Sequence, residues 1–181
     1  MWHARRMSTS AKPEPTLVDV EEVPTAVIRG VVEMAKIAAF FDSSFSRLAP
    51  AIARQGVAIV GPAFALYHGA PGAVADVEVG FPTAGAVEAD GDLVPSLLPG
   101  GRVARLVHEG SFDQLGSSWG RLGEWIAAAG LTPGEDLWEV YVTEPSPDMD
   151  PADLRTELNW PVTGASDDRH RPLADPDRAQ P

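Results

Sequence analysis

The stretch WEVYVTEPSPDMDPADLRTELNWP, residues 138–161, has the pattern of two strands joined by an acidic, proline-rich loop. Side chains alternate between the two faces of a strand. In the first strand Tyr141 therefore lies opposite the apolar row that contains Val140. In the second strand Glu157 lies opposite the row that contains Leu158. We expect Tyr141 and Glu157 to share one face, where a hydroxyl group and a carboxylate form a candidate binding site.

The composition is that of a globular protein with an excess of acidic residues. The chain has 181 residues, of which 44% are hydrophobic and 22% charged, and its formal net charge is −12. The electric field of this negative charge repels phosphate backbones and attracts cations, so direct nucleic-acid binding is not expected. The absence of cysteine excludes disulfides and thiolate catalysis. No apolar run approaches the roughly 20 residues that span a membrane, and the start lacks the apolar segment of a signal peptide. We expect a cytoplasmic protein.

Between two polar ends, the sequence has the order strand–helix–strand–strand twice. Residues 1–16 and 163–181 lack apolar periodicity and are expected to be a disordered lead and a disordered tail. The first half spans about residues 17–84 and the second half about residues 93–162 of one domain at 17–162. The expected elements are strands at 17–20 and 25–32, a helix at about 34–56, strands at 63–69, 74–82 and 102–110, a helix at 111–129, and the two strands of residues 138–161.

The two helices are predicted from apolar residues at spacings of three and four. These residues are Ile37, Phe41, Phe45, Leu48 and Ile52 in the first helix, and Leu115, Trp119, Leu122 and Ile126 in the second. Pro50 lies inside the first helix and is expected to kink or divide it. Either Ser111 or Asp113 is expected to cap the start of the second helix.

The two halves also match in sequence. VEVGFP at 77–82 corresponds to TELNWP at 156–161, with the glutamates and the prolines both 79 positions apart (157 − 78 and 161 − 82). The correspondence makes Glu78 the counterpart of Glu157, and Tyr67 the counterpart of Tyr141. Two such halves extend one sheet and leave a groove along a pseudo-twofold axis, which is a common place for a ligand.

Several short motifs follow one another in this order: VGPAFALYHG (60–69), VEVGFP (77–82), LPGGRVARLVHEGSFDQL (98–115), Trp119–x–x–Leu122–x–x–Trp125, WEVYVTEP (138–145) and RTELNWP (155–161). With these motifs the chain resembles the GyrI-like domain, the effector-binding module of bacterial multidrug-responsive regulators. The resemblance spans roughly residues 17–162. It implies an α+β fold of tandem strand–helix–strand–strand repeats, with an antiparallel sheet, two long helices and a central aromatic-lined cleft.

The resemblance also implies which residues form the site. An acidic residue at the cleft base, which Glu157 matches, would receive cationic lipophilic compounds. The aromatic residues that match the cleft are Tyr141, Trp119 and Tyr67. Regulators of this family carry a helix-turn-helix domain, for which the sequence has no room, so the chain resembles the stand-alone members. Some of these bind toxins or inhibit gyrase, and some hydrolyse cyclopropane-bearing DNA-alkylating compounds with the equivalent glutamate and aromatic residue.

Each candidate residue also has a structural interpretation. Glu157 and Glu78 are either cleft carboxylates or solvated strand residues. Tyr67 and Trp119 either line the cleft or fill the core, because both lie beside apolar positions. His68 and His108 lack carboxylates or cysteines at ligand spacing, so no metal site is expected.

We therefore expect a protein that binds a small lipophilic molecule, cationic or neutral, with Glu157 as electrostatic anchor, Tyr141 and Trp119 as walls, and Tyr67 and Glu78 as further contacts. The first alternative is a hydrolase of a small toxic electrophile, with Glu157 as general acid or base and Tyr141 orienting the substrate. The second is a protein-interaction module with a partner such as gyrase, for which the sequence offers no direct support. No cofactor is expected.

Overall fold

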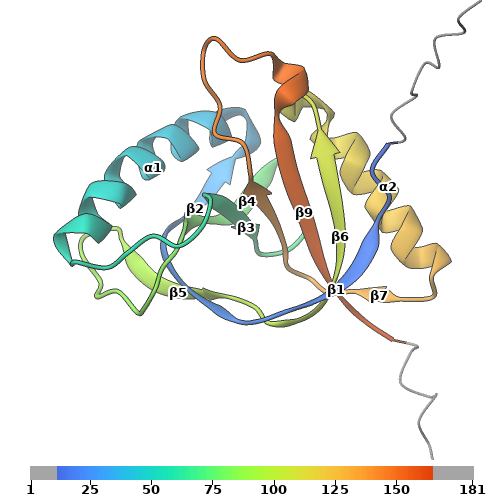
Figure 1. Cartoon of the computed structure of the whole chain (residues 1–181), viewed down its shortest axis with the longest axis horizontal. Helices are drawn as coiled ribbons and strands as arrows, with labels where there is room; N and C mark the ends of the chain where they lie inside the picture. Colours follow the sequence, from blue (N-terminus) through green and yellow to red (C-terminus); the bar gives the residue numbers. More distant parts are fainter. Residues whose placement is uncertain (1–11, 165–181) are drawn as a thin grey trace, which may run out of the picture.

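The computed structural model describes residues 12–164 and shows two long helices beside a curled antiparallel sheet (Figure 1). The strands are β1 (Thr16–Val20), β2 (Val23–Glu33), β3 (Phe64–Tyr67), β4 (Val74–Pro82), β5 (Val94–Leu98), β6 (Gly101–Glu109), β7 (Thr132–Pro133), β8 (Leu137–Tyr141) and β9 (Arg155–Thr163). The helices are α1 (Ile37–Arg54) and α2 (Leu115–Ala128), with single 3-10 turns at Met34–Lys36, Phe112–Gln114 and Pro151–Asp153. The predicted α+β class is confirmed. Most of the predicted lead and tail lies outside the described residues.

The sheet has the same arrangement on either side of its centre. The strand order is β1-β6-β9-β8-β3-β4-β2-β5, and β7 pairs with the outer part of β9. From the central β3–β8 pair outward, β4 and β2 follow on one side and β9 and β6 on the other. The predicted order strand–helix–strand–strand thus occurs as β2-α1-β3-β4 and as β6-α2-β8-β9.

The two outermost strands are exchanged between the halves. β1 precedes β2 in the chain but pairs with β6, whereas β5 precedes β6 but pairs with β2. The two connecting segments pass close to each other, so that a Cβ atom on Gly100 would come within 2.8 Å of the Glu22 backbone nitrogen. Only glycine allows this approach. The glycine pair that the sequence shows after Pro99 is therefore part of the crossing point of the two halves.

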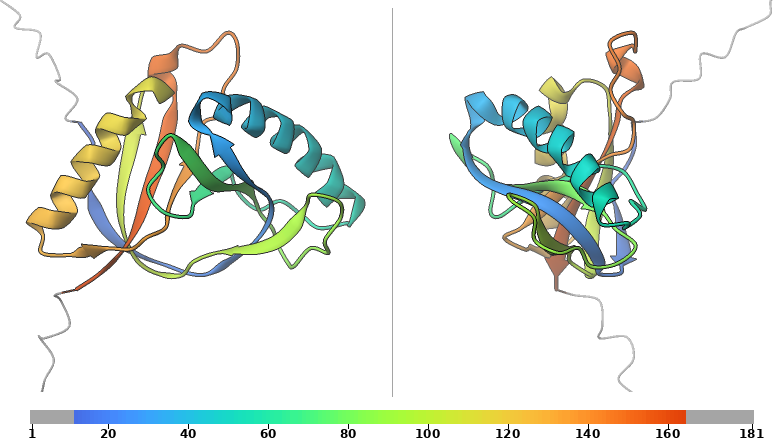
Figure 2. Two further views of the ribbon diagram at one scale, coloured as in Figure 1. Left: turned by 180° about the vertical axis from the view of Figure 1, so that it is seen from behind. Right: turned by 90° about the vertical axis from the view of Figure 1, so that its left-hand side faces the viewer.

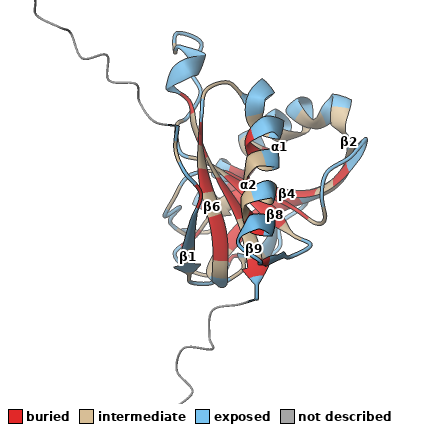
Figure 3. Ribbon diagram, turned by 90° about the vertical axis from the view of Figure 1, so that its right-hand side faces the viewer, coloured by how far each residue is buried: buried red, intermediate tan, exposed pale blue. Residues whose placement is uncertain are grey.

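Both helices cover the same face of the sheet (Figures 1 and 2). The apolar stripes predicted from the sequence form these contacts, α1 through Leu48 and Ile52 and α2 through Leu122 and Ile126. The opposite face carries a second apolar cluster with buried members Val27, Phe64, Leu66, Val103 and Trp138. Burial is concentrated in the middle strands on both faces (Figure 3). Residues 12–164 contain no helix with the length and hydrophobicity that crossing a membrane requires.

Three local expectations differ from the structure. Of the two outcomes expected at Pro50, a kink or a division, division is wrong, because α1 runs unbroken from Ile37 to Arg54. Neither Ser111 nor Asp113 caps α2 through its side chain, because a 3-10 turn precedes the helix. The strand β5 was not expected, since VPSLL contains a proline and lacks a clear alternation of polar and apolar residues. Proline is tolerated there because β5 is an edge strand.

We expect neither half to fold alone, because separation removes β1 from β6, β5 from β2, and β3 from β8. Two fragments divided between Ala89 and Asp90, both exposed, should each give a disordered circular dichroism spectrum. Mixed in equal amounts, they should regain the helical signal of the intact chain. A cooperative thermal transition in either fragment alone would contradict the expectation that each half needs the other to fold.

Candidate functional site

A single carboxylate interrupts the central apolar row on the face beneath the helices. The strand registers place six residues side by side across six strands, and they are Ile28, Val79, Ala65, Glu139, Leu158 and Leu106. Ala65 and Glu139 face each other in the central β3–β8 pair, so Glu139 lies where the two halves meet. Its residue is only 6% exposed. A buried carboxylate at this point requires polar partners.

Two hydrogen bonds hold the Glu139 carboxylate, one for each oxygen. The Trp119 Nε1–H on α2 donates to Oε1 at 2.9 Å. The Tyr141 hydroxyl, two residues along β8, donates to Oε2 at 2.8 Å. The carboxylate is therefore fixed in orientation by one group from the sheet and one from a helix. Tyr67 packs in the same cluster as Trp119 and Tyr141. We call Glu139 and these three residues the Glu139 site.

Burial dominates the ionisation of this site. It raises the pKa of Glu139 above its usual range, although the bonds from Trp119 and Tyr141 and the nearby His108 act in the opposite direction. Burial also raises the pKa of both Tyr67 and Tyr141, and the charge of Glu139 raises them further. Both tyrosines are therefore neutral hydrogen-bond donors at physiological pH. Glu139 is the group of this site whose ionisation depends on the balance between burial and its polar neighbours.

Aromatic rings from both halves surround the Glu139 site. The Tyr141 ring contacts Phe41 of α1 at a centroid distance of 6.2 Å and Phe112 of the second half at 5.9 Å. On the other side Trp119 packs edge-on against Trp160 of β9 at 5.8 Å. Phe112 is 41% exposed. The carboxylate thus lies beneath rings that reach from the sheet to the surface between α1 and α2.

The structure brings together three of the five residues predicted for the site. Tyr141, Trp119 and Tyr67 belong to one cluster on the helix-covered face, together with aromatic residues of α1. For Trp119 and Tyr67 the sequence left a core position and a cleft position open. Both side chains pack in the core and both lie beside Glu139, so the structure does not decide between the two. Which side chains bind a ligand stays a prediction.

The expectation that Glu157 shares a face with Tyr141 is wrong. The β8–β9 register pairs Val140 with Glu157 and Tyr141 with Thr156, so Glu157 lies on the opposite face with Val140. There it pairs with Arg105 at 3.2 Å and accepts a hydrogen bond from Asn159 at 3.1 Å. Its pseudo-symmetric counterpart Glu78 also lies away from the helices.

Two other polar residues adjoin the Glu139 site. Thr156 is fully buried on the helix-covered face, and its Oγ1 has no hydrogen-bond partner among residues 12–164. Its strand neighbour His108 contacts the Ser118 hydroxyl through Nδ1 at 2.8 Å and the Ser111 carbonyl through Nε2 at 2.9 Å. The Ser111 carbonyl can only accept, so Nε2–H donates to it, and in the neutral tautomer Nδ1 accepts a hydrogen bond from the Ser118 hydroxyl. His108 thereby ties the start of α2 to β6.

Sequence reasoning missed Glu139, although the signal was present. The alternation that places Val140 opposite Tyr141 also places Glu139 beside Tyr141 on the same strand face. An acidic residue two positions from a tyrosine in an otherwise apolar strand is a sufficient reason to consider it. The comparison of the halves drew attention to Glu157 instead, because a glutamate recurs at Glu78.

The family model for the GyrI-like small molecule binding domain matches residues 13–163. The chain belongs to this family. Among curated proteins none matches the sequence.

Several solved structures have a fold similar to that of this chain. The crystal structure of the EcmrR C-terminal domain has a TM-score of 0.75 and 18% identity, over 84% of this chain and 99% of that chain. EcmrR in its complex with DNA has a TM-score of 0.69 and 21% identity. This match covers 84% of this chain but only 58% of the longer EcmrR chain. SAV2435 bound to tetraphenylphosphonium has a TM-score of 0.61 and 14% identity, over 83% and 94% of the two chains. A hydrolase from Listeria innocua has a TM-score of 0.61 and 14% identity, over 84% and 93%. At these identities the likeness concerns the fold.

We expect Glu139→Gln to raise thermal stability at pH 8 but not at pH 4. Because the pKa of Glu139 is raised on folding, the folded protein binds more protons than the unfolded chain between the two pKa values. Stability is therefore lost as the pH rises through that window, and glutamine removes the loss. For a domain of this size, each 1 kcal/mol corresponds to a shift of roughly 2–4 °C in Tm. Scanning calorimetry of wild type and variant at the two pH values measures the difference in Tm.

The matched control is Glu157→Gln, which removes the same charge from the Arg105 pair on the other face. It should leave Tm unchanged or lower it at pH 8. An equal rise in both variants would mean that the effect comes from the net charge of the protein and not from the burial of Glu139.

Proposed function

We propose that the Glu139 site binds a small lipophilic molecule, cationic or neutral, as an effector- or toxin-binding protein does. The observation that carries the proposal is a buried carboxylate that forms no ion pair with a lysine or arginine of residues 12–164: the groups bonded to it are Trp119 and Tyr141, which are neutral donors. A ligand cation would supply the missing charge. The family relation and the tetraphenylphosphonium bound by SAV2435 support the same ligand class.

The surroundings favour a lipophilic cation over a hydrophilic one. Tyr141, Trp119 and the phenylalanines present ring faces and edges, and a cation near a ring face gains roughly 0.5–2 kcal/mol. A strongly hydrated ion would lose its water shell without enough polar atoms to replace it. We propose that such a ligand enters between α1 and α2, where the rings of Phe41 and Phe112 cover Tyr141. These rings would have to move aside.

Glu139, and not Glu157, takes the role of electrostatic anchor in this proposal. Glu157 already has a guanidinium partner, Arg105, and lies on the other face of the sheet from the aromatic residues. Glu78 accepts bonds from His68 and Ser96 and is likewise separated from Tyr141. The buried Thr156 hydroxyl on the Glu139 face is a further group that a ligand could use.

We expect tetraphenylphosphonium to bind with an affinity that rises with pH and then levels off. The raised pKa of Glu139 means that the empty site holds a proton at lower pH, which a bound cation displaces. In Glu139→Gln the pH dependence should disappear, and the affinity at pH 8 should fall at least about tenfold, or about 1.4 kcal/mol. Isothermal titration calorimetry measures both.

Glu157→Gln is the matched variant, and it should retain the affinity and the pH profile. A neutral compound of similar size should bind wild type and Glu139→Gln equally well. The proposal fails if Glu157→Gln loses affinity while Glu139→Gln does not, or if no lipophilic cation or neutral compound of a varied panel binds.

The raised pKa of Glu139 favours one second candidate, a hydrolase of a small electrophilic compound. A carboxylic acid with a raised pKa holds its proton to higher pH and can serve as a general acid, and the Tyr141 hydroxyl at 2.8 Å would orient the substrate or water. The fold likeness to a protein named as a hydrolase is compatible with this candidate.

If the protein is a hydrolase, a cyclopropane-bearing alkylating compound incubated with it in H₂¹⁸O should gain one labelled water, as seen by mass spectrometry. Glu139→Gln should abolish this turnover with little loss of substrate binding, because a general acid acts mainly in the transition state. Equal rates with wild type and variant would exclude a catalytic Glu139 for that compound.

A further inference from the structure

The Thr156 side chain of β9 is a buried hydroxyl beside the Glu139 site. It is 0% exposed, and its Oγ1 has no hydrogen-bond partner among residues 12–164. Most buried polar atoms of folded proteins are hydrogen-bonded, because an unpaired one has lost its bonds to water without replacement. A buried hydroxyl of this kind indicates either an unfavourable position or a partner from outside the chain.

The strand neighbours of Thr156 do not supply that partner. Tyr141 lies directly opposite it on β8 and His108 directly opposite it on β6, both on the helix-covered face. The Tyr141 hydroxyl donates to Glu139 at 2.8 Å. Both ring nitrogens of His108 contact groups at the start of α2. The two neighbours therefore direct their polar atoms away from Thr156, whichever protonation state His108 has.

Thr156 is also close enough to Glu139 for one small molecule to contact both. Glu139 lies two residues before Tyr141 on β8, so Thr156 and Glu139 are diagonal neighbours on one face of the sheet. Such neighbours are about 7–8 Å apart, a distance that a substituted phenyl ring spans. The Phe112 ring, 41% exposed, lies 5.9 Å from the Tyr141 ring. A ligand that displaces Phe112 to reach Tyr141 would also reach the hydroxyl beside it.

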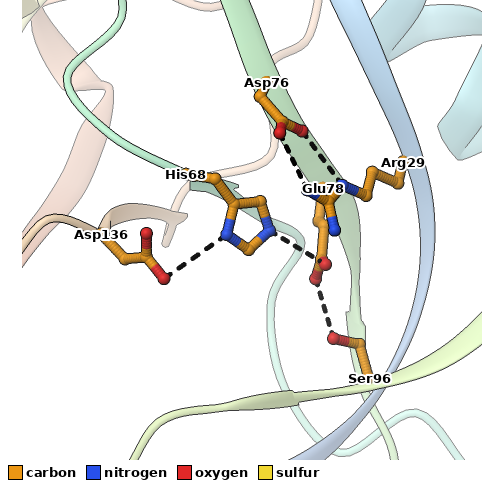
Figure 4. Close-up of polar contacts among 6 residues, drawn as sticks. All are labelled: Arg29, His68, Asp76, Glu78, Ser96 and Asp136. Carbon is orange, nitrogen blue, oxygen red and sulfur yellow. Dashed lines mark hydrogen bonds and ion pairs between the residues drawn. The ribbon is translucent and has the colours of Figure 1, made fainter.

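The opposite face of the sheet offers a comparison. There the buried Glu78 carboxylate has its partners within the chain, the Ser96 hydroxyl at 2.8 Å and a histidine nitrogen at 3.0 Å (Figure 4). Thr25 lies directly opposite Ser96, is 1% exposed, and has an Oγ1 without a partner among the described residues. The lack of a partner is therefore not sufficient evidence for a ligand. What distinguishes Thr156 from Thr25 is its place beside Glu139.

We propose that Thr156 determines specificity in the Glu139 site, and that the ligand is a lipophilic cation with an uncharged hydrogen-bonding group on its apolar body. The cationic centre lies at Glu139, and the hydrogen-bonding group lies about one phenyl ring away, at Thr156 Oγ1. A hydroxyl both donates and accepts, so an alcohol, amide or ether group of the ligand would fit. This inference rests on the proposed function and narrows its ligand class.

The test uses the full-length protein and two pairs of phosphonium probes. In each pair, one ring of tetraphenylphosphonium carries either a hydroxymethyl or an ethyl group, at the meta position in one pair and at the para position in the other. Isothermal titration calorimetry gives the ratio of the hydroxymethyl affinity to the ethyl affinity, in which the contributions shared by both probes cancel. For at least one pair we expect this ratio to fall about fivefold in Thr156→Val, because one hydrogen bond is lost.

Thr25→Val is the matched control, since it removes a hydroxyl of equal burial from the other face. It should leave both ratios unchanged, and an equal fall in both variants would contradict the proposal. Thr156→Val should also keep or raise the Tm of the free protein, because the hydroxyl it removes has no partner to lose. A lower Tm would mean that the hydroxyl is already bonded, for instance to a buried water, and would overturn the proposal.

The same titrations separate this inference from the proposed function. If tetraphenylphosphonium binding depends on Glu139 but the ratios of both pairs are equal in wild type and Thr156→Val, the role of Thr156 is wrong and the proposed function stands. If none of the phosphonium probes binds in a manner that Glu139→Gln weakens, both are wrong.

Discussion

The Glu139 carboxylate, buried at the junction of two halves, is the group on which the organisation of the site depends. Transfer of an unpaired carboxylate from water into an apolar core costs several kcal/mol. Trp119 and Tyr141 offset part of this cost with one hydrogen bond to each oxygen. Since one donor comes from α2 and the other from β8, the position of the helix on the sheet is coupled to the state of the carboxylate. Protonation of Glu139 and the position of α2 therefore act on the same two hydrogen bonds.

The exchange of edge strands explains why this junction is well defined. Two halves joined through β3 and β8 alone would meet along a few strand hydrogen bonds. Because β1 pairs with β6 and β5 pairs with β2, each half is also held by a strand of the other. The approach at Gly100 shows how closely the crossing segments pass. The residues between the halves are thereby held in place by pairings at both edges of the sheet, which would lower the entropy cost of binding at the proposed site.

The sequence predicted what is local and failed where distant strands have to be aligned. Alternation within β8 and the apolar spacing in α1 and α2 are local, and they hold in the structure. The relation of Glu157 to Tyr141 depends on the register between β8 and β9, and a shift of one residue moves every side chain to the other face. The long connection between the strands gives no indication of that register. The pairings of β1 and β5 span the whole domain, so no pattern within either strand contains them.

The environment of Glu139 should discriminate among cations, although the net charge of −12 attracts all of them. At Glu139 the carboxylate is buried among rings, so a ligand must lose its hydration and regain energy from aromatic contacts, which favours large apolar ions. The carboxylate occupies this place because the short strands β3 and β8 pair at the centre of the sheet, where the two halves meet.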